Sequence, residues 1–162
     1  MNFVVGLPKS QRMDVIMVVV DRLTKYVHFM GLSYPYSATK VATLFVQNVL
    51  KLHGLSTSIV SDWDLVFIAR FWVKLFKLQG VQLAISSTYH PQSDEQTEVV
   101  NKSLKHYLRS FLAKRPTKWV KWLYLAKFWF NTNYHTTTKM TLWEALYGFS
   151  PPKLVDYVPD TT

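Results

Sequence analysis

The first 32 residues hold three runs of β-branched and aromatic residues in quick succession, and this feature constrains the fold most strongly. The runs are NFVVGLP from residue 2, DVIMVVVDR from residue 14 and KYVHFMGL from residue 25. Each run has the composition and length of a β-strand, and only short turns separate them. The sequence therefore predicts three consecutive strands in an antiparallel meander.

Helical and strand patterns alternate after the meander. A helix is predicted from Ser37 as its N-cap to Gly54 as its stop. Its apolar face comprises Val41, Leu44, Phe45, Val49 and Leu52. The strand TSIVS, the helix ARFWVKLFKLQG and the strand VQLAIS then follow. This order predicts a parallel strand pair joined by a right-handed crossover.

Two long helices are predicted in the second half of the chain, at about 94 to 113 and 117 to 132, with Pro116 between them. The apolar stripe of the second helix comprises Trp119, Trp122, Leu123, Ala126 and Phe130. Together the elements predict an α/β fold in which a five-stranded mixed sheet, the meander plus parallel strands, is flanked by helices.

The length of 162 residues is that of one domain, which we expect to span residues 1–150, with 151–162 as a linker or tail. Cysteine is absent, which excludes disulfides and thiolate zinc sites. The longest aliphatic run, VIMVVV, is too short to span a bilayer, and no charged leader precedes it. We therefore expect a nuclear or cytoplasmic protein without a membrane or secretion signal.

The net charge of +9 is concentrated in one part of the chain. Residues 99 to 143 carry nine Lys or Arg side chains and no Asp or Glu. A polyanionic partner is the natural inference, with nucleic acid first and an anionic membrane surface second. The alternative is an ordinary solvated helical surface.

The segment YHPQSDEQTEVV places three carboxylates at the start of a predicted helix. Ser93 and Gln96 have the spacing of a capping box, and Asp94 and Glu95 fall in the first turn, where the helix dipole favours negative charge. Glu98 lies deeper and is needed for neither role. It is therefore the candidate for chemistry.

Glu98 shares one predicted helix face with three cations, Lys102, Lys105 and Arg109. On one interpretation the face is an exposed stripe with a Glu98–Lys102 ion pair. On the other, Glu98 binds a metal ion and the cations follow a phosphate backbone. Asp62 favours the second, because it ends the apolar strand TSIVS at the edge where α/β sheets place ligands. Asp62 and Glu98 together could hold Mg²⁺ or Mn²⁺.

Several segments carry a resemblance to a known family. They are GLPKS, VVVDRLTKYVHF, KLHGLSTSIVSDWD, FWVKLFKLQGVQL, SSTYHPQSDEQTEVVNKSL, WVKWL and EALYG. The chain resembles, from residue 1 to about 150, the integrase catalytic core of gypsy-class LTR retrotransposons, in the plant branch. The resemblance implies a ribonuclease H-like fold and DNA integration by phosphodiester strand transfer on two metal ions.

The resemblance also implies a metal site of two aspartates and a glutamate, with 35 residues between the last two. Asp62 and Glu98 enclose 35 residues and match that pair. The first aspartate does not match, because related sequences read MDF where this one reads MNF. Asn2 offers one neutral oxygen and cannot bridge two cations as a carboxylate does. The resemblance thus implies a degenerate site with weak metal binding.

Three hypotheses follow. The chain is an active strand transferase, a degenerate core that binds nucleic acid without cutting it, or a protein-interaction scaffold that forms a homodimer through aromatic residues of 119 to 134. Asn2 favours the second. The resemblance further implies that the first strand is truncated and that the flanking integrase domains are absent. For Asp14 and Asp21 we expect turn or strand-end roles.

Overall fold

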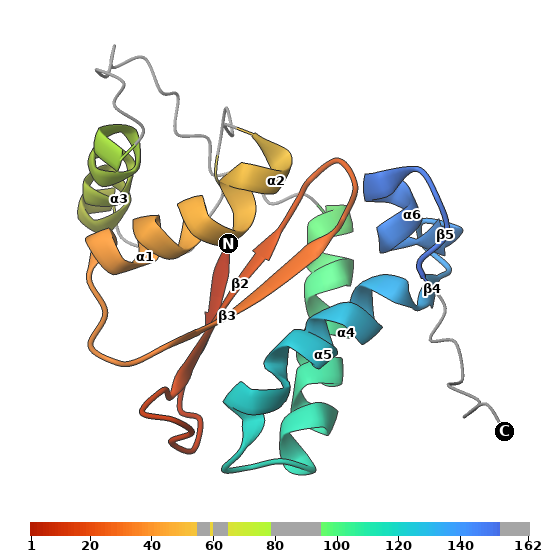
Figure 1. Cartoon of the computed structure of the whole chain (residues 1–162), viewed down its shortest axis with the longest axis horizontal. Helices are drawn as coiled ribbons and strands as arrows, with labels where there is room; N and C mark the ends of the chain where they lie inside the picture. Colours follow the sequence, from red (N-terminus) through yellow and green to blue (C-terminus); the bar gives the residue numbers. More distant parts are fainter. Residues whose placement is uncertain (55–58, 60–64, 79–94, 153–162) are drawn as a thin grey trace, which may run out of the picture.

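A computed structural model of the chain describes residues 1–54, 59, 65–78 and 95–152 (Figure 1). The first three strands are β1 (Asn2–Val4), β2 (Val15–Val20) and β3 (Val27–Leu32). Both pairings are antiparallel, with Asn2 opposite Val18 and Val18 opposite Phe29. The predicted meander is confirmed, with β2 at its centre.

The helix predicted from Ser37 to Gly54 forms, but a wider turn interrupts it. It consists of α1 (Ala38–Phe45), the π-helical turn η1 (Val46–Leu50) and α2 (Lys51–His53). Ser37 caps its start, because its hydroxyl accepts from Lys40 N–H at 3.2 Å. A π turn holds more residues than an α turn. The side chains after it therefore point in directions that differ from those of an uninterrupted α-helix. Leu52 is therefore exposed, contrary to the prediction.

Three further helices follow, α3 (Leu65–Leu78), α4 (Glu95–Ala113) and α5 (Trp119–Thr132). The bounds of α4 and α5 agree closely with the prediction, whereas α3 begins several residues before the predicted start. A small hairpin, β4 (Tyr134–His135) and β5 (Met140–Thr141), and the helix α6 (Leu142–Tyr147) complete the chain. The sequence analysis did not predict these last three elements.

Helices cover both faces of the three-stranded sheet. The side chains of β2 alternate between the faces, as strand geometry requires. Ile16 and Val18 pack in the cluster that includes α4 and α5, while Met17 and Val19 pack in the cluster that includes α1 and α3. Figure 1 shows these two helix pairs on opposite sides of the strands. The uninterrupted apolar run of β2 is explained by this two-sided burial.

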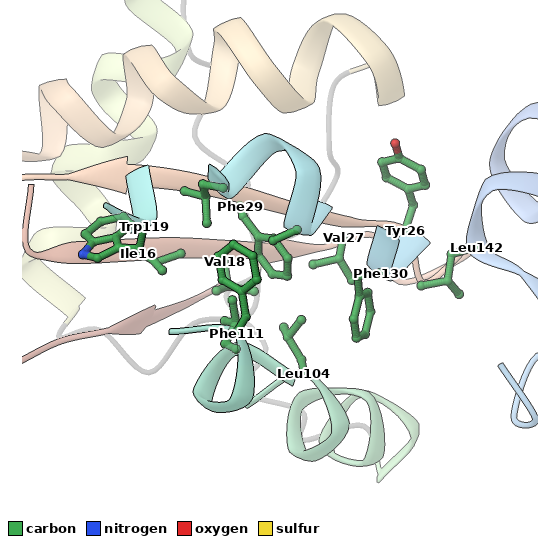
Figure 2. Packing of buried hydrophobic residues seen from close by; sticks show 13 residues of the cluster. Ile16, Val18, Tyr26, Val27, Phe29, Leu104, Phe111, Trp119, Phe130 and Leu142 are labelled. Carbon is green, nitrogen blue, oxygen red and sulfur yellow. The ribbon is translucent and has the colours of Figure 1, made fainter. Parts of the chain in front are cut away.

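The cluster on the α4 and α5 face is rich in aromatic rings. Figure 2 shows Phe29 and Val18 of the sheet facing Phe111 of α4 and Phe130 of α5. Phe29 and Phe130 meet edge to face, with ring centroids 6.2 Å apart. Trp119 is fully buried, as the predicted stripe of α5 requires.

The predicted strands TSIVS and VQLAIS fall almost wholly outside the described residues, so the five-stranded sheet stays a prediction. In the part of the chain that the structure describes, the sheets are the three-stranded meander and the β4–β5 hairpin. Across the same residues, every helix is too short or too polar to cross a bilayer.

Candidate functional site

The three predicted metal-site residues are placed only in part. Asn2 is the first residue of β1 and lies partly buried beside the central strand, opposite Val18. Glu98 is the fourth residue of α4, but its side chain lies outside the described residues, as does the whole of Asp62. Glu98 therefore lies on the predicted helix. That the three side chains lie close together stays a prediction.

The cationic face predicted on α4 is present. Lys102, Lys105 and Arg109 are all exposed. The opposite side of the helix is held in the core by Leu104, which is buried, and by Tyr107, whose hydroxyl donates to Ala126 C=O at 3.3 Å. The exposure of these three cations agrees with both interpretations of this face, a phosphate track and a solvated stripe.

Asp14 and Asp21 have the structural roles expected for them. Asp14 accepts from the backbone N–H of Tyr34 at 2.8 Å. Asp21 accepts from both the backbone N–H and the hydroxyl of Thr24, at 2.8 and 2.7 Å, which closes the turn between β2 and β3.

A chain of polar side chains, which the sequence analysis missed, links α5 to α2 across the edge strand β3. Lys127 Nζ lies 3.0 Å from His28 Nδ1, and His28 Nε2 lies 2.8 Å from His53 Nε2. His53 Nδ1 in turn lies 4.0 Å from Asp21 Oδ1. We call these four residues the histidine chain.

The direction of each hydrogen bond in the histidine chain follows from the ammonium group of Lys127 at one end. An ammonium group only donates, so His28 Nδ1 accepts from Lys127. The hydrogen of a neutral His28 is then on Nε2, which donates to His53 Nε2. His53 consequently carries its hydrogen on Nδ1, the nitrogen that faces Asp21.

The surroundings keep both imidazoles neutral. Burial, reinforced by the positive charge of Lys127, lowers the pKa of His28 to about 3. Burial also lowers the pKa of His53, although the carboxylate of Asp21 opposes this. The pKa of Lys127 is lowered too, first by burial and then by Lys51.

The histidine chain is not arranged to bind a metal ion, because the two Nε2 atoms are directed at each other. Among the described residues, no three His, Asp or Glu side chains converge as metal ligands. One feature of the sequence indicates the histidine chain. His28 interrupts a run predicted to be a buried strand, and a buried polar side chain requires a partner.

The sequence is similar to retrotransposon polyproteins. It is 30% identical over 151 residues to the Transposon Tf2-3 polyprotein of Schizosaccharomyces pombe, over 93% of this chain and 11% of that polyprotein. The Tf2-4 polyprotein of the same organism gives the same values. The chain thus spans about a tenth of the curated relatives it matches. No family model matches the sequence.

Solved structures of retroviral integrases are similar in fold. The HTLV-2 integrase catalytic core domain, determined with magnesium in a trimeric form, has a TM-score of 0.60 at 17% identity, over 90% of this chain and 94% of that one. The BIV integrase catalytic core domain has a TM-score of 0.58 at 22% identity, over 90% of this chain and 92% of that one. The chain therefore has the ribonuclease H-like fold of retroviral integrase catalytic cores, and its sequence is similar to one segment of a retrotransposon polyprotein.

Proposed function

We propose that this chain is a degenerate integrase catalytic core, derived from a gypsy-class LTR retrotransposon of the plant branch, that binds DNA and retains little or no strand-transfer activity. The observation that carries the proposal is the integrase-core fold in a chain whose sequence is similar, over nearly all of its length, to part of a retrotransposon polyprotein. Such a protein binds DNA in the nucleus or cytoplasm.

The reaction of the family, which this chain would retain weakly or not at all, is metal-dependent cleavage and joining of phosphodiester bonds. Asp62 and Glu98 would hold Mg²⁺ or Mn²⁺, since carboxylates are the ligands that these cations prefer. The bound ions would activate the attacking oxygen and stabilise the leaving one. The donor set suits a hard cation in chemical type, but the amide of Asn2 leaves it one negative charge short.

Changing Asn2→Asp supplies the missing charge and tests the proposal. We expect the variant to gain Mn²⁺-dependent nicking or strand transfer on short DNA duplexes. Loss of an outer-shell partner of a metal site typically costs about 10–100-fold in activity, so a direct ligand should restore at least about tenfold. The control is Asn133→Asp, which adds the same charge at an exposed position after α5.

A second substitution separates metal chemistry from a contaminating nuclease. Adding Glu98→Gln to the Asn2→Asp protein should abolish the gained activity, because the proposed site then loses another carboxylate. Equal activity in the Asn2→Asp and unchanged proteins would reject the three-ligand site, as would activity that survives Glu98→Gln.

An alternative function is a protein-interaction scaffold that dimerises through α5 and the residues just after it. The observation in its favour is the exposure of large aromatic side chains there. Tyr124 and Tyr134 are each 65% exposed and Trp129 is 39% exposed. Light scattering over a concentration series measures the mass in solution. A dimer that Tyr124→Ser with Trp129→Ser dissociates would support this alternative.

A further inference from the structure

Exposed cations from two distant segments gather at one end of the molecule. The turn between β1 and β2 supplies Lys9 and Arg12. The connection between α4 and α5 supplies Lys114 and Lys118, and the start of α5 supplies Lys121. Figure 1 shows the β1–β2 turn, in dark red, and the α4–α5 turn, in teal, at the same end of the structure. We call these five residues and Arg115 the basic end.

Two hydrogen bonds hold the segments of the basic end together. Trp119 Nε1 donates to Pro8 C=O at 2.8 Å, and Val120 N–H donates to the hydroxyl of Ser10 at 3.2 Å. Trp119 and Ser10 are both buried, so these contacts belong to the folded core. The positions of Lys9 and Lys121, more than a hundred residues apart in sequence, are therefore set by the fold rather than by flexible loops.

Aromatic rings support the cations on the helical side. The guanidinium carbon of Arg115 lies 4.9 Å from the centroid of the Phe111 ring and 5.6 Å from that of Trp122. Lys121 Nζ lies 5.5 Å from the same Trp122 ring. A guanidinium stacked on a ring keeps its N–H donors free in its own plane, which is the geometry that binds a phosphate with two hydrogen bonds.

The two segments that build the basic end carry a single carboxylate, Asp14. Residues 1–13 contain no Asp or Glu, and neither do residues 99–143. Asp14, the last residue of the β1–β2 turn, is partly buried and accepts from Tyr34 N–H, so the exposed charges that the two segments contribute to the basic end are all positive. A surface of this kind attracts a polyanion.

We propose that the basic end binds the phosphate backbone of nucleic acid, at a place separate from the predicted metal site. Lys114 follows the last residue of α4, whereas Glu98 is the fourth residue of that helix. Sixteen residues of helix span about 24 Å, at about 1.5 Å per residue. That length matches about seven nucleotides along one DNA strand, at about 3.4 Å per nucleotide. A duplex can therefore reach the basic end while its reacting bond lies near Glu98.

The inference rests on the proposed function for its choice of partner, because a core that binds DNA needs a surface for the DNA beyond the predicted metal site. An anionic membrane would offer phosphates as well. Membrane-surface binding, however, combines attraction to anionic lipids with apolar side chains that enter the lipid. The aromatic rings at the basic end, Phe111 and Trp122, are packed against the core beneath the cations instead.

A binding experiment without metal tests the basic end. The triple variant Lys114→Gln, Lys118→Gln and Lys121→Gln is compared with the unchanged full chain by fluorescence anisotropy on a short DNA duplex, in EDTA, over a series of salt concentrations. Each lost phosphate contact lowers the salt slope by about 0.9. We expect a slope smaller by about 2 to 3, and affinity weaker by about tenfold or more at low salt.

A matched triple variant separates a local contact from the effect of net charge. Lys40→Gln, Arg70→Gln and Lys77→Gln remove three exposed cations from α1 and α3, on the other face of the sheet. We expect this variant to keep both the affinity and the salt slope. Far-UV circular dichroism and the melting temperature check that both variants remain folded.

A single change on the other segment tests the joint surface. Lys9→Gln should lower the salt slope by about 1, although Lys9 lies far from the helical cations in sequence. Unchanged slopes in the first triple variant, an equal loss in the control variant, or lost binding to phosphatidylserine vesicles with unchanged DNA affinity would each overturn the inference. Because no metal is present, these results are independent of the nicking assay on Asn2→Asp.

Discussion

At the scale of single residues, the histidine chain makes the stability of the fold depend on pH. The pKa of His28 is about 3 in the folded chain, against an ordinary value of 6.5. Between these two values the unfolded chain binds the proton and the folded chain does not. The free energy of unfolding therefore falls as the pH drops from about 6.5 towards 3, and this contribution is complete only above 6.5.

We predict that His28→Gln removes most of this pH dependence. A glutamine carbonyl can accept from Lys127 and its amide can donate to His53, but the side chain takes up no proton. One pKa unit corresponds to about 1.4 kcal/mol, so the unchanged chain should lose on the order of 1–2 kcal/mol between pH 7 and pH 5. Urea unfolding at the two pH values measures the difference.

The control for His28→Gln is His106→Gln on α4, where the histidine is exposed. This variant should retain the pH dependence of the unchanged chain. If His28→Gln and His106→Gln give the same slope of stability against pH, the buried imidazole is not the source of the effect.

At the scale of elements, one side chain joins α5 to the edge strand β3. Asn131 accepts from Val27 N–H at 2.9 Å and donates to Val27 C=O at 2.8 Å, and it is fully buried. Its amide therefore pairs with β3 as a neighbouring strand would. Within the sheet that the described residues form, β3 lies at one edge, and this contact occupies backbone groups that could otherwise pair with another chain.

We predict that Asn131→Ala destabilises the fold by roughly 2–4 kcal/mol, because a buried N–H and a buried C=O lose their partners at about 1–3 kcal/mol each. The free energy of unfolding in urea measures the loss. Asn133→Ala, two residues later and exposed, is the matched control and should change stability by less than about 0.5 kcal/mol. A small effect at Asn131 would mean that water satisfies Val27 in the variant.

The elements that the sequence predicted well are those whose periodicity reflects burial. The β-branched runs gave β1 to β3, and the stripe through Trp119, Leu123 and Phe130 gave α5, because packing alone selects those residues. The β4–β5 hairpin escaped prediction because each of its strands has only two residues. Such short strands show no alternation.

The candidate site was predicted less completely, for reasons that are also physical. Spacing and a wheel diagram correctly place Lys102, Lys105 and Arg109 on an exposed face. The histidine chain depends on contacts across 25 and 99 residues of sequence, which no local pattern encodes. Tertiary packing decides features of this kind.

At the scale of the whole molecule, the two apolar clusters share one strand. Successive side chains of β2 enter opposite clusters, so neither cluster can lose its packing without disturbing the strand that serves the other. The described part of the chain should therefore unfold as one cooperative unit. The position of the aromatic residues allows this to be tested, because Trp119 lies in one cluster while Trp72 packs against the other.

We predict that Leu108→Ala on α4 and Leu75→Ala on α3 each lower the free energy of unfolding by about 2–5 kcal/mol, since each removes a fully buried side chain from a different cluster. Tryptophan fluorescence and far-UV circular dichroism should give coincident urea transitions in both variants. Leu23→Ala, at a position that is 90% exposed, should leave the transition unchanged. Separate transitions in either core variant would mean that the two faces of the sheet unfold independently, and that β2 does not couple them.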